Sequence, residues 1–251
     1  MHFPIELHIG SFTITLHAVM ETLAFFIGFR YFLFLRKKQG DHYASSSRIW
    51  VIVGAIFGAL IGSRLIGALE RPYELSLTDN LLGYIYNNKT VVGGFLGGLL
   101  GVETVKKIIG EKRASGDLFV YPMILALIIG RIGCFSMGVH EEVYGAESSM
   151  PWAMNLGDGL RRHPAVLYEI LFLLLLWASL RNLQRRTVLE TGALFKAFMI
   201  SYLFFRFLAD FIKPHYPVFS GLSTIQLSCL AGLFYYLPFI LHPKKLIATY
   251  A

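Results

Sequence analysis

The stretch "ILALIIGRIGCFSMGVHEEVYG" (residues 124–145) indicates what kind of fold this chain has. It starts as an apolar run that leads to Arg131, and a polar loop with His140, Glu141 and Glu142 follows. An ionisable group inside lipid costs on the order of 3 kcal/mol on insertion scales, so it usually has a partner and a purpose. The stretch therefore predicts a transmembrane helix that carries a functional arginine near one end.

The composition of the whole chain agrees with a membrane protein. Of 251 residues, 55% are hydrophobic and only 16% are charged, whereas about 25% of the residues in soluble domains are charged. The net charge of +7 comes from short Lys and Arg clusters between apolar runs, so it does not indicate a nucleic acid as partner. Cys134 and Cys229 lie in apolar runs and offer neither a disulfide framework nor a zinc-site spacing.

Seven apolar runs, each near the ~20 residues needed to cross a bilayer, predict an all-α, polytopic integral membrane protein with one seven-helix domain over residues 1–251. Their bounds are roughly 13–35, 49–69, 91–109, 118–138, 164–181, 193–213 and 223–242. Lys and Arg clusters follow the first, third, fifth and seventh runs. The positive-inside rule then predicts an N-terminus outside and a C-terminus in the cytoplasm. The loop at about 139–163 would be extracytoplasmic.

The third run begins with the glycine-rich stretch "VVGGFLGGLLG" (residues 91–101). Glycines such as Gly93 and Gly94 allow two helices to pack closely. Alternatively, they allow the backbone to approach a ligand, in part as a re-entrant segment. The sequence leaves both interpretations open.

Other ionisable residues lie within or at the ends of the apolar runs. Tyr202, Arg206 and Asp210 are spaced by four residues, so they share one helix face. Arg206 and Asp210 could simply neutralise each other, but Arg64 and Arg131 leave surplus positive charge. Because guanidinium binds phosphate through two parallel hydrogen bonds, we expect a phospholipid headgroup in a cavity open to the outer leaflet. The full set is His17, Glu21, Arg64, Arg131, Arg206 and Asp210.

Seven motifs, in this order, resemble those of the bacterial prolipoprotein diacylglyceryl transferase family over most of the chain. They are "IGSRLIG", "VGGFLGG", "GDLFVYPMILALIIGRIGCF", "EVYG", "RRHPAVLYE", "YLFFRFLADFIKP" and "TIQLSCL". The closest match is "RRHPAVLYE" with the family's Arg-His-Pro-Ser-Gln-Leu-Tyr-Glu. The matched residues are Arg64, Gly93, Gly94, Asp117, Arg131, Gly133, Glu142, Gly145, Arg162, His163, Pro164, Tyr168, Glu169, Tyr202, Arg206, Asp210, Lys213 and Gln226.

The resemblance implies a multi-pass enzyme of the bacterial inner membrane. It would move the diacylglyceryl group of phosphatidylglycerol to the thiol of a lipobox cysteine in an exported prolipoprotein, and glycerol phosphate would leave. Negative charge then builds on the departing phosphate, so cations must already be in place there. The residues expected in catalysis are Arg131, Arg206, Glu142, His140 and His17. Those expected to bind the phosphate and headgroup are Arg64, Arg131, Arg162, Arg206, Tyr202, Gly93, Gly94, Gly133 and Gly145. Those expected to balance charge or support the structure are Glu21, Asp117, Asp210, Tyr168, Glu169 and Gln226. Neither a cofactor nor a metal is expected.

The chain departs from the family where the reaction needs a proton acceptor, since only a thiolate is a good nucleophile. The family's histidine before Gly-Gly is Val92 here, and the asparagine of its arginine motif is Cys134. The family's first-span tyrosine corresponds to Glu21 or to Val19, depending on how the first run is aligned.

Two residues are inserted before "EVYG", which brings His140 and Glu141 close to Glu142. His140 and His17 are the alternative bases, because histidine titrates near working pH. A solvated loop histidine for His140 and a membrane-boundary histidine for His17 are the structural alternatives. Two functions therefore remain: a diverged transferase with its usual or another acceptor, and a non-catalytic phospholipid-binding membrane protein that has lost the base.

Overall fold

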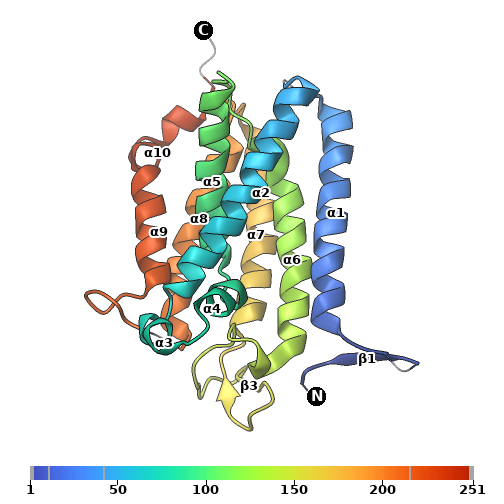
Figure 1. Cartoon of the computed structure of the whole chain (residues 1–251). Coiled ribbons are helices and arrows are strands. Elements are labelled where there is room, and N and C mark those ends of the chain that lie inside the picture. The colour runs from blue at the N-terminus through green and yellow to red at the C-terminus, as the bar shows by residue number, and fades with distance from the viewer. Residues whose placement is uncertain (1–2, 11, 42, 215, 249–251) are drawn as a thin grey trace.

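The computed structural model describes residues 3–10, 12–41, 43–214 and 216–248, and most of these residues are helical (Figure 1). The α-helices are α1 (Leu16–Gln39), α2 (Ser45–Ala68), α3 (Pro72–Leu77), α4 (Leu81–Asn87), α5 (Val91–Ile108), α6 (Val120–Met137), α7 (Ala165–Arg186), α8 (Ala193–Ala209), α9 (Thr224–Tyr235) and α10 (Leu237–Leu241). Short 3-10 turns are η1 (Asp117–Phe119), η2 (Gly138–His140), η3 (Asp210–Ile212) and η4 (Pro243–Leu246). Two small antiparallel sheets pair β1 (Glu6–Ile9) with β2 (Phe12–Thr15) and β3 (Met154–Asn155) with β4 (Arg161–Arg162).

Each of the seven predicted apolar runs coincides with a long helix or, for the last run, with the pair α9 and α10. Within the described residues, four helices are long and apolar enough to cross a membrane: α1, α2, α6 with its flanking turns, and α7. Helices α5, α8 and α9 do not meet these requirements of length and apolar character. Helix α5 ends in charged residues, α8 has 17 residues, and α9 has 12. The membrane class is confirmed, and the count of seven crossings stays a prediction.

Two boundaries differ from the predicted runs. Residues 13–15 belong to strand β2 and not to the first helix, because Thr15 is the N-cap of α1 and its hydroxyl accepts a hydrogen bond from the backbone N–H of Ala18. Helix α1 instead continues beyond the apolar run through Arg36, Lys37 and Lys38. Long basic side chains can keep their charged heads in the membrane interface, which allows such a helix to extend past the lipid.

Helices α2 and α5 cross with their backbones in contact. Three glycines of α2, spaced by four residues, face three glycines of α5 with the same spacing: Gly54, Gly58 and Gly62 face Gly93, Gly97 and Gly101. A Cβ atom built on Gly97 would lie 2.2 Å from the carbonyl oxygen of Gly58. Gly93 therefore lies in a close helix contact, and α5 is one continuous helix.

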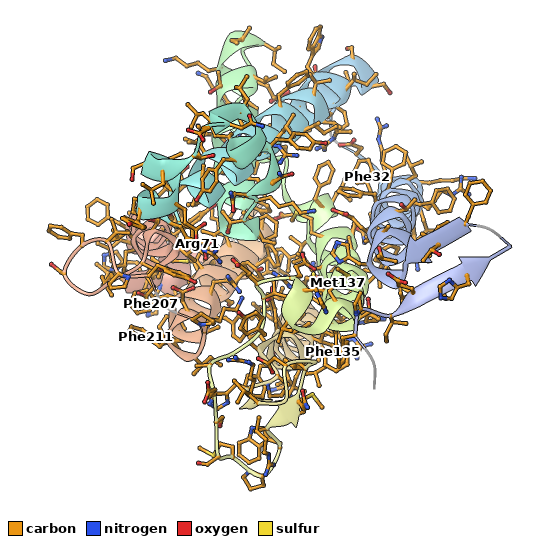
Figure 2. All side chains as sticks on the ribbon, turned by 60° about the horizontal axis from the view of Figure 1, so that its bottom comes forward. Phe32, Arg71, Phe135, Met137, Phe207 and Phe211 are labelled. Carbon is orange, nitrogen blue, oxygen red and sulfur yellow. The ribbon has the colours of Figure 1, made fainter. Side chains whose placement is uncertain are left out.

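Helix α1 packs on α6 and not on α2, its neighbour in sequence (Figure 2). Small residues make this contact possible, since a Cβ atom on Gly28 would lie 3.0 Å from that of Ala126, and one on Gly133 would lie 2.9 Å from that of Met20. The α1–α6 pair and the α2–α5 pair are thus two separate units, joined through α7, α8 and α9.

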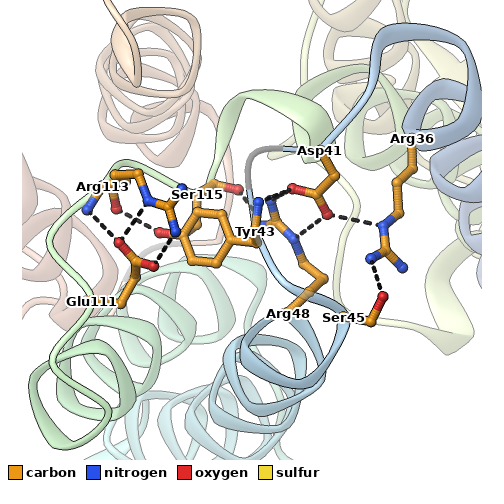
Figure 3. Close-up of polar contacts among 8 residues, drawn as sticks. All are labelled: Arg36, Asp41, Tyr43, Ser45, Arg48, Glu111, Arg113 and Ser115. Carbon is orange, nitrogen blue, oxygen red and sulfur yellow. Dashed lines mark hydrogen bonds and ion pairs between the residues drawn. The ribbon is translucent and has the colours of Figure 1, made fainter.

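Figure 1 places strand β1 and helix α10 at opposite ends of the bundle. We call the end near β1, β3, α3 and α4 the hairpin end, and the other the far end. At the far end a polar network around Asp41 ties the α1–α2 loop to the segment between α5 and α6 (Figure 3). Arg48, which is buried, bonds to Asp41 through Nε at 2.8 Å and to the carbonyl oxygen of Ser115 at 2.9 Å. Arg36 Nε lies 2.9 Å from Asp41 Oδ2, and the Tyr43 hydroxyl donates to the carbonyl of Arg113 at 2.6 Å.

Candidate functional site

A cavity of about 1020 Å³ lies between the α1–α6 and α2–α5 pairs and reaches α8. All six ionisable residues that the sequence places within or at the ends of apolar runs contribute to its wall. These are His17, Glu21, Arg64, Arg131, Arg206 and Asp210. Polar groups inside a membrane turn away from lipid and toward each other or toward a cavity, and this explains why residues from α1, α2, α6, α8 and η3 meet here.

Glu169 of α7 holds the two central arginines together. Its carboxylate lies 3.0 Å from Nε of Arg131 and 3.4 Å from Nη1 of Arg206. The Tyr202 hydroxyl donates a hydrogen bond to the same carboxylate at 2.7 Å. All four side chains are buried. One carboxylate between two guanidinium groups leaves one net positive charge in this cluster, on the side where Arg131 and Arg206 reach the cavity.

Arg206 of α8 has an ion-pair partner on another helix. Arg206 pairs with Glu169, and its buried Nε has no hydrogen-bond partner within the described ranges 3–10, 12–41, 43–214 and 216–248. Asp210 accepts a hydrogen bond from the Ser223 hydroxyl. Ser223 also forms a capping box with Gln226 at the start of α9, so Gln226 stabilises that helix end and is not on the cavity wall.

More cations lie along the cavity toward the hairpin end. Arg64 donates to the carbonyl oxygen of Tyr86 and lies 4.3 Å from the centre of the Tyr86 ring. Arg71 also lines the cavity and forms an ion pair with Glu142. In Figure 2, Arg71 lies between the α2–α4 segment and α8. Lys89 lines the wall as well and lies 3.1 Å from Glu21.

Glu70, Arg71 and Lys89 are charged residues of this wall that do not stand out in the sequence. They follow or precede the apolar runs, and nothing in their local sequence separates them from ordinary loop charges. Burial and the nearby charge of Asp210 raise the pKa of Glu70.

The glycines of α5 divide between the two interpretations. Gly93 is packed against Gly62, whereas Gly94 lies on the cavity wall, where an added Cβ would meet its nearest atom only at 3.8 Å. Gly133 lies where α6 packs against α1, and a Cβ atom at this position would lie 2.9 Å from the Cβ atom of Met20. Helical spacing therefore places Gly93 in a helix contact and Gly94 at the space where a ligand would lie.

Several expected site residues lie away from the cavity wall. Arg162 pairs with Asp158 at 2.7 Å and lies over the Tyr144 ring. Gly145 donates its backbone N–H to the His163 carbonyl at 3.1 Å. Their positions indicate that they shape the loop between α6 and α7.

Three more of these residues belong to caps or to the outer surface of the bundle. Asp117 accepts from the backbone N–H groups of Gly192 and Phe195, so it caps α8 at the far end. Tyr168 accepts from Trp152 Nε1 at 2.6 Å. His140 is exposed and does not line the cavity.

The fold and the cavity define a class: a helical membrane protein in which buried arginines face a space between its helices. Comparison with known proteins gives a more specific assignment. The family model described as prolipoprotein diacylglyceryl transferase matches residues 4–241, and the chain belongs to this family.

Three relatives, each called phosphatidylglycerol–prolipoprotein diacylglyceryl transferase, show the extent of the similarity. The relative from Cupriavidus metallidurans is 31% identical over 243 residues, which is 90% of this chain and 85% of the relative. The relative from Methylobacillus flagellatus is 31% identical over 245 residues, covering 90% and 88%. The relative from Bordetella parapertussis is 32% identical over 245 residues, covering 90% and 87%. The predicted family and the predicted enzyme class, a transferase, are confirmed.

Proposed function

We propose that this protein transfers the diacylglyceryl group of phosphatidylglycerol to the thiol of a lipobox cysteine in an exported prolipoprotein and releases glycerol phosphate. The observation that carries the proposal is the cluster in which Glu169 holds Arg131 and Arg206 at the cavity wall with surplus positive charge. The relatives' names describe the same donor and acceptor.

In this reaction Arg131 and Arg206 would stabilise the negative charge of the leaving group. The acceptor sulfur forms a bond to the glyceryl carbon, the bond between that carbon and the phosphate oxygen breaks, and its electron pair stays on the phosphate. Arg131 and Arg206 lie ready to bind the growing charge, because Glu169 and Tyr202 fix them in place before the reaction. Arg64 and Arg71 extend the positive wall over the headgroup.

The middle of the cavity suits acyl chains, whereas its far end also carries the charged residues Glu103, Lys106, Lys112 and Lys196. Between the central arginines and the far end the cavity is lined by apolar side chains of α5 and α6, among them Phe95, Leu99, Met123 and Leu127. A phospholipid with its phosphate at Arg131 would therefore bury its chains along α5 and α6, where apolar contact is favourable.

We also propose seven crossings of the bacterial inner membrane, with the hairpin end outside. Helices α1, α5 and α7 all carry their basic last turns at one end of the bundle, the far end. By the positive-inside rule that end faces the cytoplasm. The central arginines then lie toward the outer leaflet, where exported prolipoproteins are presented.

The second function, a non-catalytic phospholipid-binding protein, is favoured by one observation. Val92, which stands where the family has its histidine, is fully buried in the hydrophobic core. No proton can be accepted at that position.

The test uses the purified full chain in lipid nanodiscs with phosphatidylglycerol and a lipobox peptide, and measures the release of glycerol phosphate. We expect turnover, and we expect Arg131→Ala to reduce kcat by about 10²- to 10³-fold. Arg185→Ala, on an exposed residue at the far end of α7, is the matched control. If the wild type binds phosphatidylglycerol but no acceptor thiol is modified, the non-catalytic function replaces this one.

A further inference from the structure

A cluster beside Arg131 is not needed for phosphate binding. The ring and carboxylate atoms of His17 and Glu141 and the sulfur of Cys134 all lie within 4.8 Å of one another. His17 Nδ1 is 3.0 Å from Glu141 Oε2, and both atoms are buried. Cys134 Sγ lies 3.7 Å from Nη1 of Arg131. All four residues line the cavity.

We propose that His17 is the proton acceptor for the incoming thiol and that Glu141 is the residue that positions it. This inference rests on the transferase function proposed above. It supplies the base that Val92 cannot supply, and it selects His17 over His140, which is exposed and away from the cavity.

The helix contacts explain how His17 reaches this place. Thr15 caps α1, so His17 lies in the first helical turn, at the hairpin end. A Cβ atom on Gly133 would lie 3.3 Å from the His17 backbone, so the lack of a side chain there lets α1 approach α6 closely. Arg131 and Cys134 are one helical turn apart on α6, and this places the imidazole beside the phosphate-binding cluster.

Glu141 sets which ring nitrogen can act. Glu141 Oε2 lies 3.0 Å from Nδ1 without hydrogen-bond geometry. A rotation of the ring would let the carboxylate accept a proton from Nδ1, and the lone pair of Nε2 would then be left for a proton from the substrate. The same carboxylate stabilises the imidazolium that then forms. A nucleophile, a base and a group that orients the base form a recurrent catalytic arrangement. Here the nucleophile is the thiol of the acceptor peptide.

The charges around the ring are compatible with this role. Glu21 Oε2 lies 3.6 Å from Nε2, but Glu21 also pairs with Lys89, so its charge is partly neutralised. Cys134 faces the ring from α6, and Arg131 lies behind it. The ring therefore faces the carboxylates of Glu21 and Glu141 on one side and the guanidinium group of Arg131 on the other.

The reaction balances with these groups alone. The thiol proton moves to Nε2 as the sulfur–carbon bond forms, and the carbon–oxygen bond to phosphate breaks with its electron pair on the oxygen held at Arg131. The proton on His17 then passes to the released phosphate or to water, which restores the neutral base.

The experiment measures kcat, KM and phosphatidylglycerol binding for His17→Gln in the nanodisc assay. A general base contributes about 10²- to 10⁴-fold, so kcat should fall at least 100-fold while lipid binding changes by less than threefold. His8→Gln is the matched control, because His8 lies on the exposed hairpin and contacts Thr13. If the wild type turns over and His17→Gln keeps more than a third of its kcat, the inference is wrong. An inactive wild type would instead refute the proposed function.

The positioning role needs its own readout. Glu141→Gln keeps an oxygen near Nδ1 but removes the charge that stabilises the imidazolium, so we expect kcat to fall about 10-fold, with the activity rising at lower pH than in the wild type. The pH profile would stay unchanged if Glu141 served only the loop structure. Stoichiometric zinc in the purified wild type that is lost in His17→Gln would also overturn the inference, since His17, Cys134 and Glu141 would then be metal ligands.

Discussion

Both ends of the bundle place one carboxylate between two arginines, and the two clusters differ in what remains for a ligand. At the far end Asp41 holds Arg36 and Arg48, whose other donors go to the Ser45 hydroxyl and the Ser115 carbonyl. Near the hairpin end, Glu169 holds two arginines that also form the wall of a cavity. The same charge pattern ties two loops together at one end, and at the other it places positive charge at the wall of a cavity.

The largest effect on the difference between the two clusters is expected when the carboxylate of Glu169 is removed. In Glu169→Ala two buried guanidinium groups lose their shared partner, so we expect a loss of about 3–5 kcal/mol in unfolding free energy and no turnover. Chemical unfolding in detergent and the glycerol phosphate assay measure the two effects. Glu169→Gln keeps the shape and an acceptor for Tyr202, so it should be the milder change. Equal stability of Glu169→Ala and the wild type would mean that the arginines do not depend on Glu169.

The second test exchanges an arginine for lysine in each cluster. Arg206→Lys keeps the charge but loses the planar set of donors, so kcat should fall about 10- to 100-fold, the value of one charge-assisted hydrogen bond. Arg48→Lys, measured in the same assay, should lower only the thermal unfolding midpoint. A similar loss of kcat in both variants would remove the distinction between the two ends.

The smallest effect is expected from pH. Burial alone would raise the pKa of Asp41, but the hydrogen bonds and charge of Arg48, with the charge of Arg36, hold it below its ordinary value. The stability that this carboxylate contributes is present above its unfolded-state pKa and is lost as pH falls through its lower folded-state pKa. The unfolding midpoint of the wild type should therefore drop more between pH 7 and pH 3 than that of Asp41→Asn. Parallel pH curves for the two proteins would contradict this.

The cost of placing charge in lipid determines which site residues can be predicted from the sequence. His17, Arg131 and Arg206 stand out in sequence because lipid excludes charge, so their position in an apolar run already predicts a cavity. The sequence does not predict that Arg131 and Arg206 share Glu169, because the three residues come from α6, α7 and α8 and meet only in the folded bundle. Glu70 and Arg71 lie just outside the runs and look like ordinary loop charges.

The fold shows a similar division. The helices follow from the apolar runs, but α9 is shorter than its run and α5 ends in charged residues, so neither is among the four described helices long and apolar enough to cross a membrane. The glycine spacing of α2 was readable in sequence, since Gly54, Gly58 and Gly62 recur every fourth residue. Their partners on α5 could not be assigned without the structure, because Gly94 and Gly98 share the same spacing on the cavity side.

The backbone contact between α2 and α5 has a consequence for whatever occupies the cavity. Side chains can change rotamer to suit a guest, but along this line of contact there are none to move: at Gly58, Gly97 and Gly101 an added carbon would meet a carbonyl oxygen at 2.1–2.2 Å. The spacing between α2 and α5 is therefore fixed, while the cavity side of α5 carries side chains such as Phe95 and Leu99. A molecule in the cavity would be accommodated by side chains of the wall or by the opposite side, where α1 rests on α6, and not by closer packing of α2 on α5.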